Sequence, residues 1–195
     1  MKKILTLLYL TSTAFFIGGV AMTFYDYTYQ GYYTTKMINW VWLLLTISVI
    51  ILNWKIKSIR IYFFSLLTLL VLSILPMGIP FAGIVYYFTT IGDYQQIEIN
   101  ENYRLERTNH QALSLTRIYI YEKKGFLEKN IYRTPYSDVI RNTINKAPYP
   151  LNHDEKKIPI QRIKFISSNN DSIGIEYQIL DMKAIFYHKF DDDGY

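Results

Sequence analysis

The stretch "NWKIKSIRIYFF", residues 53–64, places three cations, Lys55, Lys57 and Arg60, between two long apolar runs. A helix rises about 1.5 Å per residue and needs about 20 mainly apolar residues to cross the roughly 30 Å hydrocarbon core of a bilayer. The runs on both sides of this stretch approach or exceed that length and contain no charged side chain. The stretch is therefore typical of a short loop between two membrane-spanning helices.

The charge-free segments predict three spans within residues 1–92. The first two helices are expected over about residues 4–25 and 38–54. The third segment, about residues 61–88, exceeds one span but is too short for two, and its "PMGIP" motif contains residues that bend or break a helix. We expect a third helix kinked at Pro76, with its tail near the interface. A re-entrant or fourth crossing is the alternative, and unpaired backbone groups in lipid disfavour it.

The N-terminal segment, "MKKILTLLYLTSTAFFIGGVA" (residues 1–21), also resembles a secretory signal peptide. It has two lysines, an apolar core, and small residues around Gly19 and Ala21. Its apolar part exceeds the usual 7 to 15 residues or so, which favours an uncleaved helix. In either case the chain leaves this segment on the outer side of the membrane.

The formal charge of +5 belongs to the membrane half of the chain. Residues 1–92 carry six cations and one anion, whereas residues 93–195 carry fifteen of each sign. A neutral soluble half has no net field with which to collect phosphates, so nucleic acid is not expected as a partner. The absence of cysteine excludes disulfides, thiolate zinc sites and cysteine nucleophiles.

The distribution of cations predicts the topology. The positive-inside rule counts Lys and Arg in short loops near helix ends. The 53–64 stretch carries three cations, and Lys2 and Lys3 lie on the same side of a three-helix arrangement, whereas the 25–37 loop carries Lys36 alone. The prediction is a multi-pass protein of the bacterial cytoplasmic membrane, with its N-terminus inside and its C-terminal domain outside.

The loop "YDYTYQGYYTTK", residues 25–36, contains five tyrosines. Tyrosine is enriched at the membrane–water interface, so this loop is expected to anchor the protein there. Tyrosine is also enriched at protein interfaces, which makes the loop a candidate contact surface for a partner or for the protein's own domain. Both interpretations remain open from the sequence.

Residues 93–195 predict a small, mainly antiparallel β-domain. Apolar and polar residues alternate in about seven short runs, with a hairpin at Lys124 and Gly125 and a closing three-stranded meander after residue 158. "SDVIRNTINK" begins with the N-cap candidates Ser137 and Asp138 and predicts one or two helical turns. The expected architecture is a sandwich, a roll or a partly open barrel.

No sequence motif indicates catalysis, a cofactor or a metal. The chain lacks a glycine-rich phosphate loop, an HExxH motif and a GxSxG elbow. His110, His153 and His188 lack the close spacing of metal ligands, and the "HDE" of residues 153–155 lies in a proline-flanked charged loop that predicts exposure. A non-enzymatic role is expected.

Two groups of residues are candidates for contacts. Tyr119, Tyr121 and Tyr132 are expected on one strand face, which could form an interface if it is exposed. The cations of residues 53–64 are expected at anionic headgroups, in addition to their topological role. The expected partners are membrane lipid and another envelope protein, or a second copy bound through the helices, where Ala14 and Gly18 form a small-xxx-small pair.

The combined prediction is a bacterial integral membrane protein that presents a small extracytoplasmic β-domain as a binding, sensing or assembly module. A different class of function follows from a resemblance of layout. A few helices followed by a small β-domain resemble the membrane effectors of bacterial antiphage signalling systems, in which a β-barrel binds a cyclic nucleotide and the helices disrupt the membrane. This resemblance implies a β-domain in the cytoplasm, and no sequence motif carries it.

Overall fold

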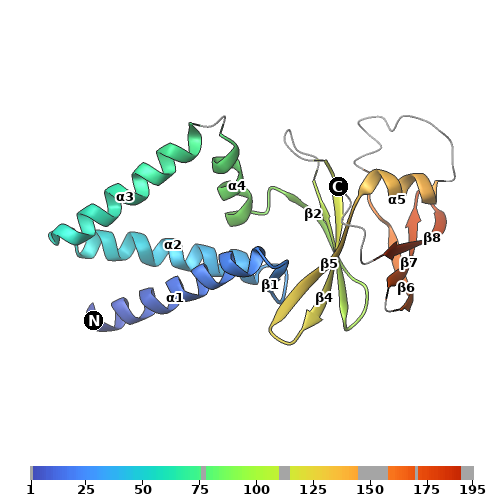
Figure 1. Cartoon of the computed structure of the whole chain (residues 1–195), viewed down its shortest axis with the longest axis horizontal. Helices are drawn as coiled ribbons and strands as arrows, with labels where there is room; N and C mark the ends of the chain where they lie inside the picture. Colours follow the sequence, from blue (N-terminus) through green and yellow to red (C-terminus); the bar gives the residue numbers. More distant parts are fainter. Residues whose placement is uncertain (1, 76–77, 110–114, 145–157, 170, 190–195) are drawn as a thin grey trace. The chain divides into compact units, whose positions relative to one another are not determined.

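The structure is a computed structural model that describes residues 2–75, 78–109, 115–144, 158–169 and 171–189. The chain forms two compact units (Figure 1). The first comprises Met1–Tyr25 and Gly31–Thr90, and the second comprises Asp26–Gln30 and Ile91–Tyr195. The first unit is helical and the second is rich in β-strands, which confirms the predicted fold class. Pro76, His110 and the loop of residues 145–157 lie outside the described residues.

The helical unit contains α1 (Lys2–Thr23), α2 (Thr34–Leu52), α3 (Lys57–Ile74) and α4 (Ile79–Phe88). Among the described residues, three helices, α1, α2 and α3, are long and apolar enough to cross a membrane, which indicates a membrane protein. Helix α4 has 10 residues and a length of about 15 Å, about half of the hydrocarbon core.

Two helices, α3 and α4, stand where the sequence predicts one kinked helix. Gly78 adopts a left-handed conformation with φ of 70° immediately before α4, which is accessible to glycine because it has no Cβ. Pro80 lies in the first turn of α4, where a missing N–H costs nothing. Helix α3 therefore ends at Ile74, and a separate helix, α4, begins at Ile79.

Side chains from the start of α2 cap the end of α4. The last carbonyls of a helix have no partner within the helix. Here three of them accept hydrogen bonds: Tyr86 O from Lys36 Nζ at 2.6 Å, Tyr87 O from Asn39 Nδ2 at 2.9 Å, and Phe88 O from Trp40 Nε1 at 2.9 Å. The end of α4 therefore lies beside the start of α2.

Among its described residues, the β-rich unit contains eight strands in two open antiparallel sheets (Figure 1). The strand order is β1-β5-β4-β3-β2 in the five-stranded sheet and β6-β7-β8 in the three-stranded sheet. The strands are β1 (Tyr27–Tyr29), β2 (Asp93–Glu98), β3 (Tyr103–Thr108), β4 (Arg117–Lys124), β5 (Leu127–Pro135), β6 (Arg162–Ser168), β7 (Ser172–Ile179) and β8 (Met182–Lys189).

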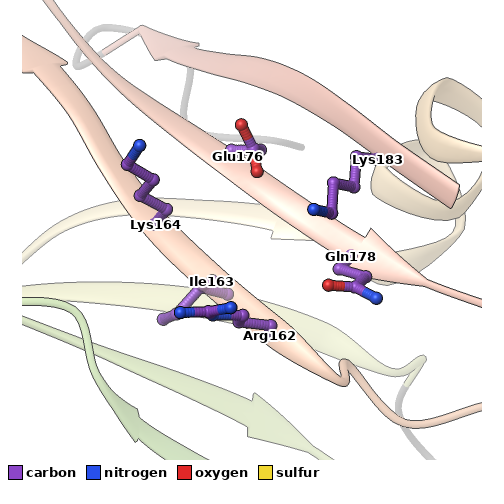
Figure 2. Close-up of a pocket in the computed structure, with 6 residues that line it drawn as sticks. All are labelled: Arg162, Ile163, Lys164, Glu176, Gln178 and Lys183. Carbon is purple, nitrogen blue, oxygen red and sulfur yellow. The ribbon is translucent and has the colours of Figure 1, made fainter. Parts of the chain in front are cut away.

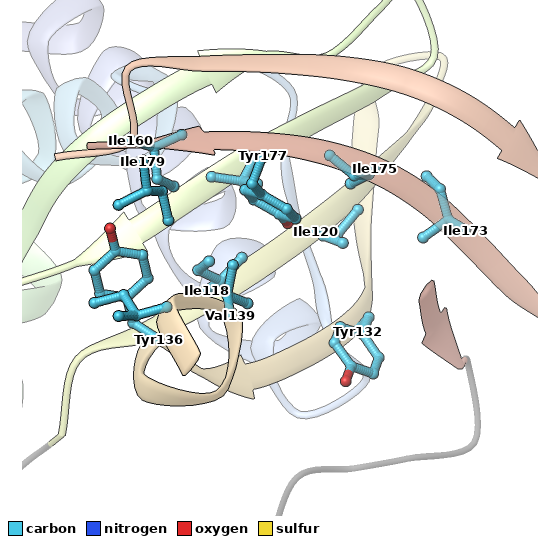
Figure 3. Packing of buried hydrophobic residues seen from close by; sticks show 12 residues of the cluster. Ile118, Ile120, Tyr132, Tyr136, Val139, Ile160, Ile173, Ile175, Tyr177 and Ile179 are labelled. Atoms are coloured by element: carbon cyan, nitrogen blue, oxygen red, sulfur yellow. The ribbon is translucent and has the colours of Figure 1, made fainter. Parts of the chain in front are cut away.

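The two sheets and α5 (Tyr136–Thr143) enclose one hydrophobic core (Figure 3). Strand β4 contributes Ile118 and Ile120, and β7 contributes isoleucines and Tyr177, all fully buried. Helix α5 buries residues at i, i+3, i+4 and i+7 from Tyr136, an amphipathic spacing. The helix follows Pro135 and receives no side-chain cap hydrogen bond, so the expected N-cap role of Ser137 or Asp138 is wrong.

A β-bulge changes which side chains of β5 face the core. Ile120 lies opposite Tyr132, but the next residue, Tyr121, lies opposite Asn130. Because side chains alternate along a strand, this one-residue shift exchanges the two faces beyond it. Tyr132 is therefore 7% exposed and contacts His188 edge to face, with ring centroids 4.6 Å apart. Tyr132 does not share a face with Tyr119 and Tyr121, contrary to expectation.

Part of the tyrosine-rich loop belongs to the β-rich unit. Tyr27–Tyr29 form β1, which pairs antiparallel with β5 and places Thr28 opposite Glu128. Gln30 N donates to Phe126 O at 3.0 Å, and Asn130 N donates to Asp26 O at 2.7 Å. Of the two interpretations of the loop, contact with the protein's own domain holds for these residues.

Candidate binding surface

The outward face of the three-stranded sheet carries polar and charged residues in register. The inward residues of β6, β7 and β8 pack on the core, so alternate residues point away from it. Two cross-strand rows on this outward face are Arg162–Gln178–Lys183 and Lys164–Glu176–Ile185. We call this set, together with Tyr187, the basic face.

The basic face surrounds a shallow hollow of about 220 Å³ (Figure 2). Its lining residues are Arg162, Ile163, Lys164, Glu176, Gln178 and Lys183. Three of these side chains are cations and one is a carboxylate, so the hollow is electropositive. Within the described parts of the chain, no carboxylate oxygen, including those of Glu176, lies within 4.0 Å of the three cationic groups. Among the described residues, therefore, no ion pair neutralises their charge.

An aromatic ring lies next to the hollow. Tyr187 is opposite Gly174 and is 56% exposed. A Cβ on Gly174 would lie 2.9 Å from Tyr187 Cε1, so the ring occupies the space that a side chain would take. The basic face thus combines three cations with an exposed aromatic ring, and both Arg and Tyr are enriched at binding interfaces.

The basic face was not predicted from the sequence, because the summed charge of residues 93–195 is zero. A neutral total conceals local segregation of charge. The signal was present in "QRIKF", where Arg162 and Lys164 are two residues apart and must share one face of a strand. Lys183 joins them only through the β7–β8 register, which the sequence does not specify.

The predicted tyrosine face is partly occupied by an internal ion-pair network. Tyr119 and Tyr121 stack with ring centroids 6.4 Å apart, and the Arg104 guanidinium lies 4.5 Å from the Tyr121 ring centroid. Arg104 donates to Glu128 Oε2 from Nη2 at 2.6 Å and from Nε at 3.0 Å, and also bonds Gln96. Burial raises the pKa of Tyr121. Tyr121 therefore packs against the Arg104 guanidinium of this network, and the interface role of Tyr119 stays a prediction.

A second arginine is held between two rings. The Arg107 guanidinium lies 3.7 Å from the Tyr136 ring centroid and 4.4 Å from that of Tyr94. Its Nη1 donates to Gln95 Oε1 at 3.1 Å and to Ile158 O at 2.5 Å. Burial raises the pKa of Tyr136 to about 12, so the phenol stays neutral and the attraction is of the cation–π kind. This arrangement joins α5, β3 and the segment before β6.

The histidine that the structure describes belongs to the core. His188 is fully buried, and its Nε2 lies 2.8 Å from the Tyr177 hydroxyl oxygen. His110, His153 and the "HDE" loop lie outside the described residues. In the portion of the chain that is described, no group of three or more His, Asp or Glu side chains could hold a metal ion.

The three cations of residues 53–64 lie at the junction of α2 and α3. Lys55, Lys57 and Arg60 are exposed, and the last two belong to the first turn of α3. Trp54 and Phe63 meet beside them, edge to face, with ring centroids 5.3 Å apart. The cations therefore border an apolar surface.

Comparison of the chain with protein-family models, with curated proteins and with solved structures finds no match.

Proposed function

We propose that this chain is a bacterial integral membrane protein that presents its β-rich unit outside the cytoplasmic membrane as a non-enzymatic binding module. Its binding surface is the basic face, and its ligand is an anionic, phosphate-bearing polymer at the cell surface. One observation carries the proposal: Arg162, Lys164 and Lys183 surround a hollow without a carboxylate partner among the described residues. Phosphate suits such a cluster, since both Arg and Lys bind it well.

The position of β1 supports the assignment of sides. Strand β1 lies in the chain between α1 and α2, and it pairs with β5 of the β-rich unit. If α1 and α2 both span the membrane, the β-rich unit must be on the side where their connecting loop emerges. Three crossings satisfy this condition and four do not. The length of α4, about half a crossing, agrees with three.

The cation count then favours the outer side. The loop that contains β1 precedes a single cation, Lys36, whereas the α2–α3 connection carries three. By the positive-inside rule the α2–α3 connection is cytoplasmic, and the loop with β1 is outside. The alternative function, a ligand-gated effector of a bacterial defence system, needs the opposite orientation.

The absence of cysteine from the chain makes orientation directly measurable. Two single-cysteine variants are informative: Phe126→Cys at the β4–β5 turn, where Phe126 is 91% exposed, and Ser58→Cys in the first turn of α3. In bacterial spheroplasts, a membrane-impermeant maleimide should label Phe126→Cys at once and Ser58→Cys only after permeabilisation. The cysteine-free parent is the control. The reverse pattern would favour the effector function.

Binding is tested with the purified full-length protein in detergent, with polyphosphate as the probe and neutral dextran as the reference. Exposed charge contacts contribute roughly 0.2–1 kcal/mol each, so Lys164→Gln/Lys183→Gln should weaken polyphosphate binding by about 2- to 30-fold. The matched control, Lys124→Gln/Arg141→Gln, removes two cations from other surfaces. Equal losses in the two double variants would show that attraction is diffuse and would refute a binding site on the basic face.

A further inference from the structure

An apolar groove lies between the end of α2 and the start of α3. Its volume is about 410 Å³, within the range of roughly 300–1,000 Å³ that is usual for small-molecule sites. The lining residues are Ile47, Ile50, Ile51, Trp54 and Phe63. Helix α3 contributes Phe63 to this lining, and none of its described residues is buried. In a membrane, only an apolar chain could fill this space favourably.

The mouth of the groove is electropositive. Lys57 and Arg60 lie in the first turn of α3, which contains no acidic residue and has no side-chain cap at Ile56. The N-terminus of a helix carries about half a positive charge, so cations there are repelled by the helix as well as by one another. Across the described residues, no carboxylate pairs with Lys55, Lys57 or Arg60. An external anion would relieve this repulsion.

Arg60 and the groove lie along one face of α3. Residues three apart on a helix share a face, and Arg60 lies one turn closer to the helix start than Phe63. Arg60 is therefore positioned above the groove that Phe63 lines. A ligand at this place has an anionic head at the first turn of α3 and an apolar tail between the two helices.

We infer that this groove is a specific site for an anionic phospholipid. Its phosphate contacts Lys57, Arg60 and the first N–H groups of α3, those of Lys57 and Ser58, and one acyl chain lies along the isoleucines of α2. Helix N-termini bind phosphate through these N–H groups. The site requires that α2 and α3 span a membrane, as in the proposed function, but it does not depend on the ligand of the basic face or on the orientation.

The test uses the purified full-length protein in detergent and native mass spectrometry with phosphatidylglycerol or phosphatidylcholine of identical chains. A cation near the headgroups contributes about 1 kcal/mol, or about fivefold in affinity. Lys57→Gln and Arg60→Gln should each weaken phosphatidylglycerol binding about fivefold and leave phosphatidylcholine binding unchanged. Lys3→Gln, which removes a cation from the N-terminus, is the matched control and should have no effect.

A fluorescence measurement tests the tail position. In a Trp40→Phe/Trp42→Phe background, Trp54 is the remaining tryptophan. Phosphatidylglycerol with brominated acyl chains should quench it at concentrations about 25-fold lower than brominated phosphatidylcholine, and Arg60→Gln should reduce this difference to about fivefold. Equal quenching by the two lipids, or an equal loss in Lys3→Gln, would mean ordinary lipid contact and would overturn the inference. Reversed maleimide labelling with retained lipid preference would overturn only the proposed orientation.

Discussion

The β-rich unit should lose stability at mildly acidic pH, because His188 binds a proton more readily in the unfolded chain than in the folded protein. The imidazole is fully buried among Tyr132, Tyr177 and Phe186, and its Nε2 lies 2.8 Å from the Tyr177 hydroxyl oxygen. In the described portion of the structure, its Nδ1 has no hydrogen-bond partner. Burial lowers the pKa of His188 from 6.5 to about 3, because the imidazolium would lose its hydration in this apolar site.

The sign of the pH effect follows from proton linkage. A histidine in the unfolded chain binds a proton below pH 6.5, whereas folded His188 does so only near pH 3. The unfolded state therefore binds more protons between these values, and the free energy of unfolding falls as the pH falls through this window. For a pKa difference of this size, lowering the pH from 7 to 5 should cost about 2 kcal/mol.

The assay is urea unfolding of the full-length protein in detergent, followed by circular dichroism of the β-rich unit at pH 7, 6 and 5. The His188→Phe variant keeps an aromatic ring without a titrating group, so it should lose this pH dependence. Its lower stability at pH 7 does not affect the comparison of slopes. If His188→Phe retains the full pH dependence, the burial argument for His188 is refuted.

Two further predictions concern buried contacts of the β-rich unit. Glu128→Gln should lower the free energy of unfolding by up to about 3–5 kcal/mol, because the buried Arg104 loses its ion pair with Glu128 and keeps only the one with Glu106 at 3.2 Å. The double variant Arg104→Met/Glu128→Leu should lower it less, and urea unfolding measures both. Gly174→Ala should lower the free energy of unfolding by about 1–3 kcal/mol, because its Cβ would clash with the Tyr187 ring. Adding Tyr187→Ala should recover most of this loss, and thermal unfolding of the single and double variants measures it. An undiminished cost in the second double variant would show that backbone conformation, not the Tyr187 ring, requires glycine.

The membrane helices and most strands could be predicted because their signals are local. A charge-free run of 18 or more residues has few alternatives to a spanning helix. Alternation of side chains is likewise local, and it predicts the β4–β5 hairpin, where Gly125 adopts φ of 66°. The bulge after Ile120 is not local in this sense, because it is a property of the pairing of two strands. That pairing reversed the predicted environment of Tyr132.

The candidate binding surface was harder to predict than the fold for the same reason. Arg162 and Lys164 lie on one strand, and their spacing alone places them on one face. Lys183 reaches the same hollow because β7 lies between β6 and β8 in the sheet and sets both registers. A count of charges along the chain averages this cluster with anions elsewhere. Strand order, rather than composition, decides whether a neutral domain has a basic face.

Strand β1 lies in the chain between the first two helices, but it belongs to the five-stranded sheet of the β-rich unit. It is only three residues long, shorter than the strand that a sequence pattern can identify, and its tyrosines equally suit a membrane interface. Its partner, β5, would otherwise be an edge strand with unpaired backbone groups, which natural proteins usually cover. Because β1 comes from the loop between the first two helices, this edge is covered only when that loop and the β-rich unit are on the same side of the membrane. The five-stranded sheet is therefore complete if the chain crosses the membrane three times before the β-rich unit. A fourth crossing would put β1 and β5 on opposite sides and leave the edge of β5 open.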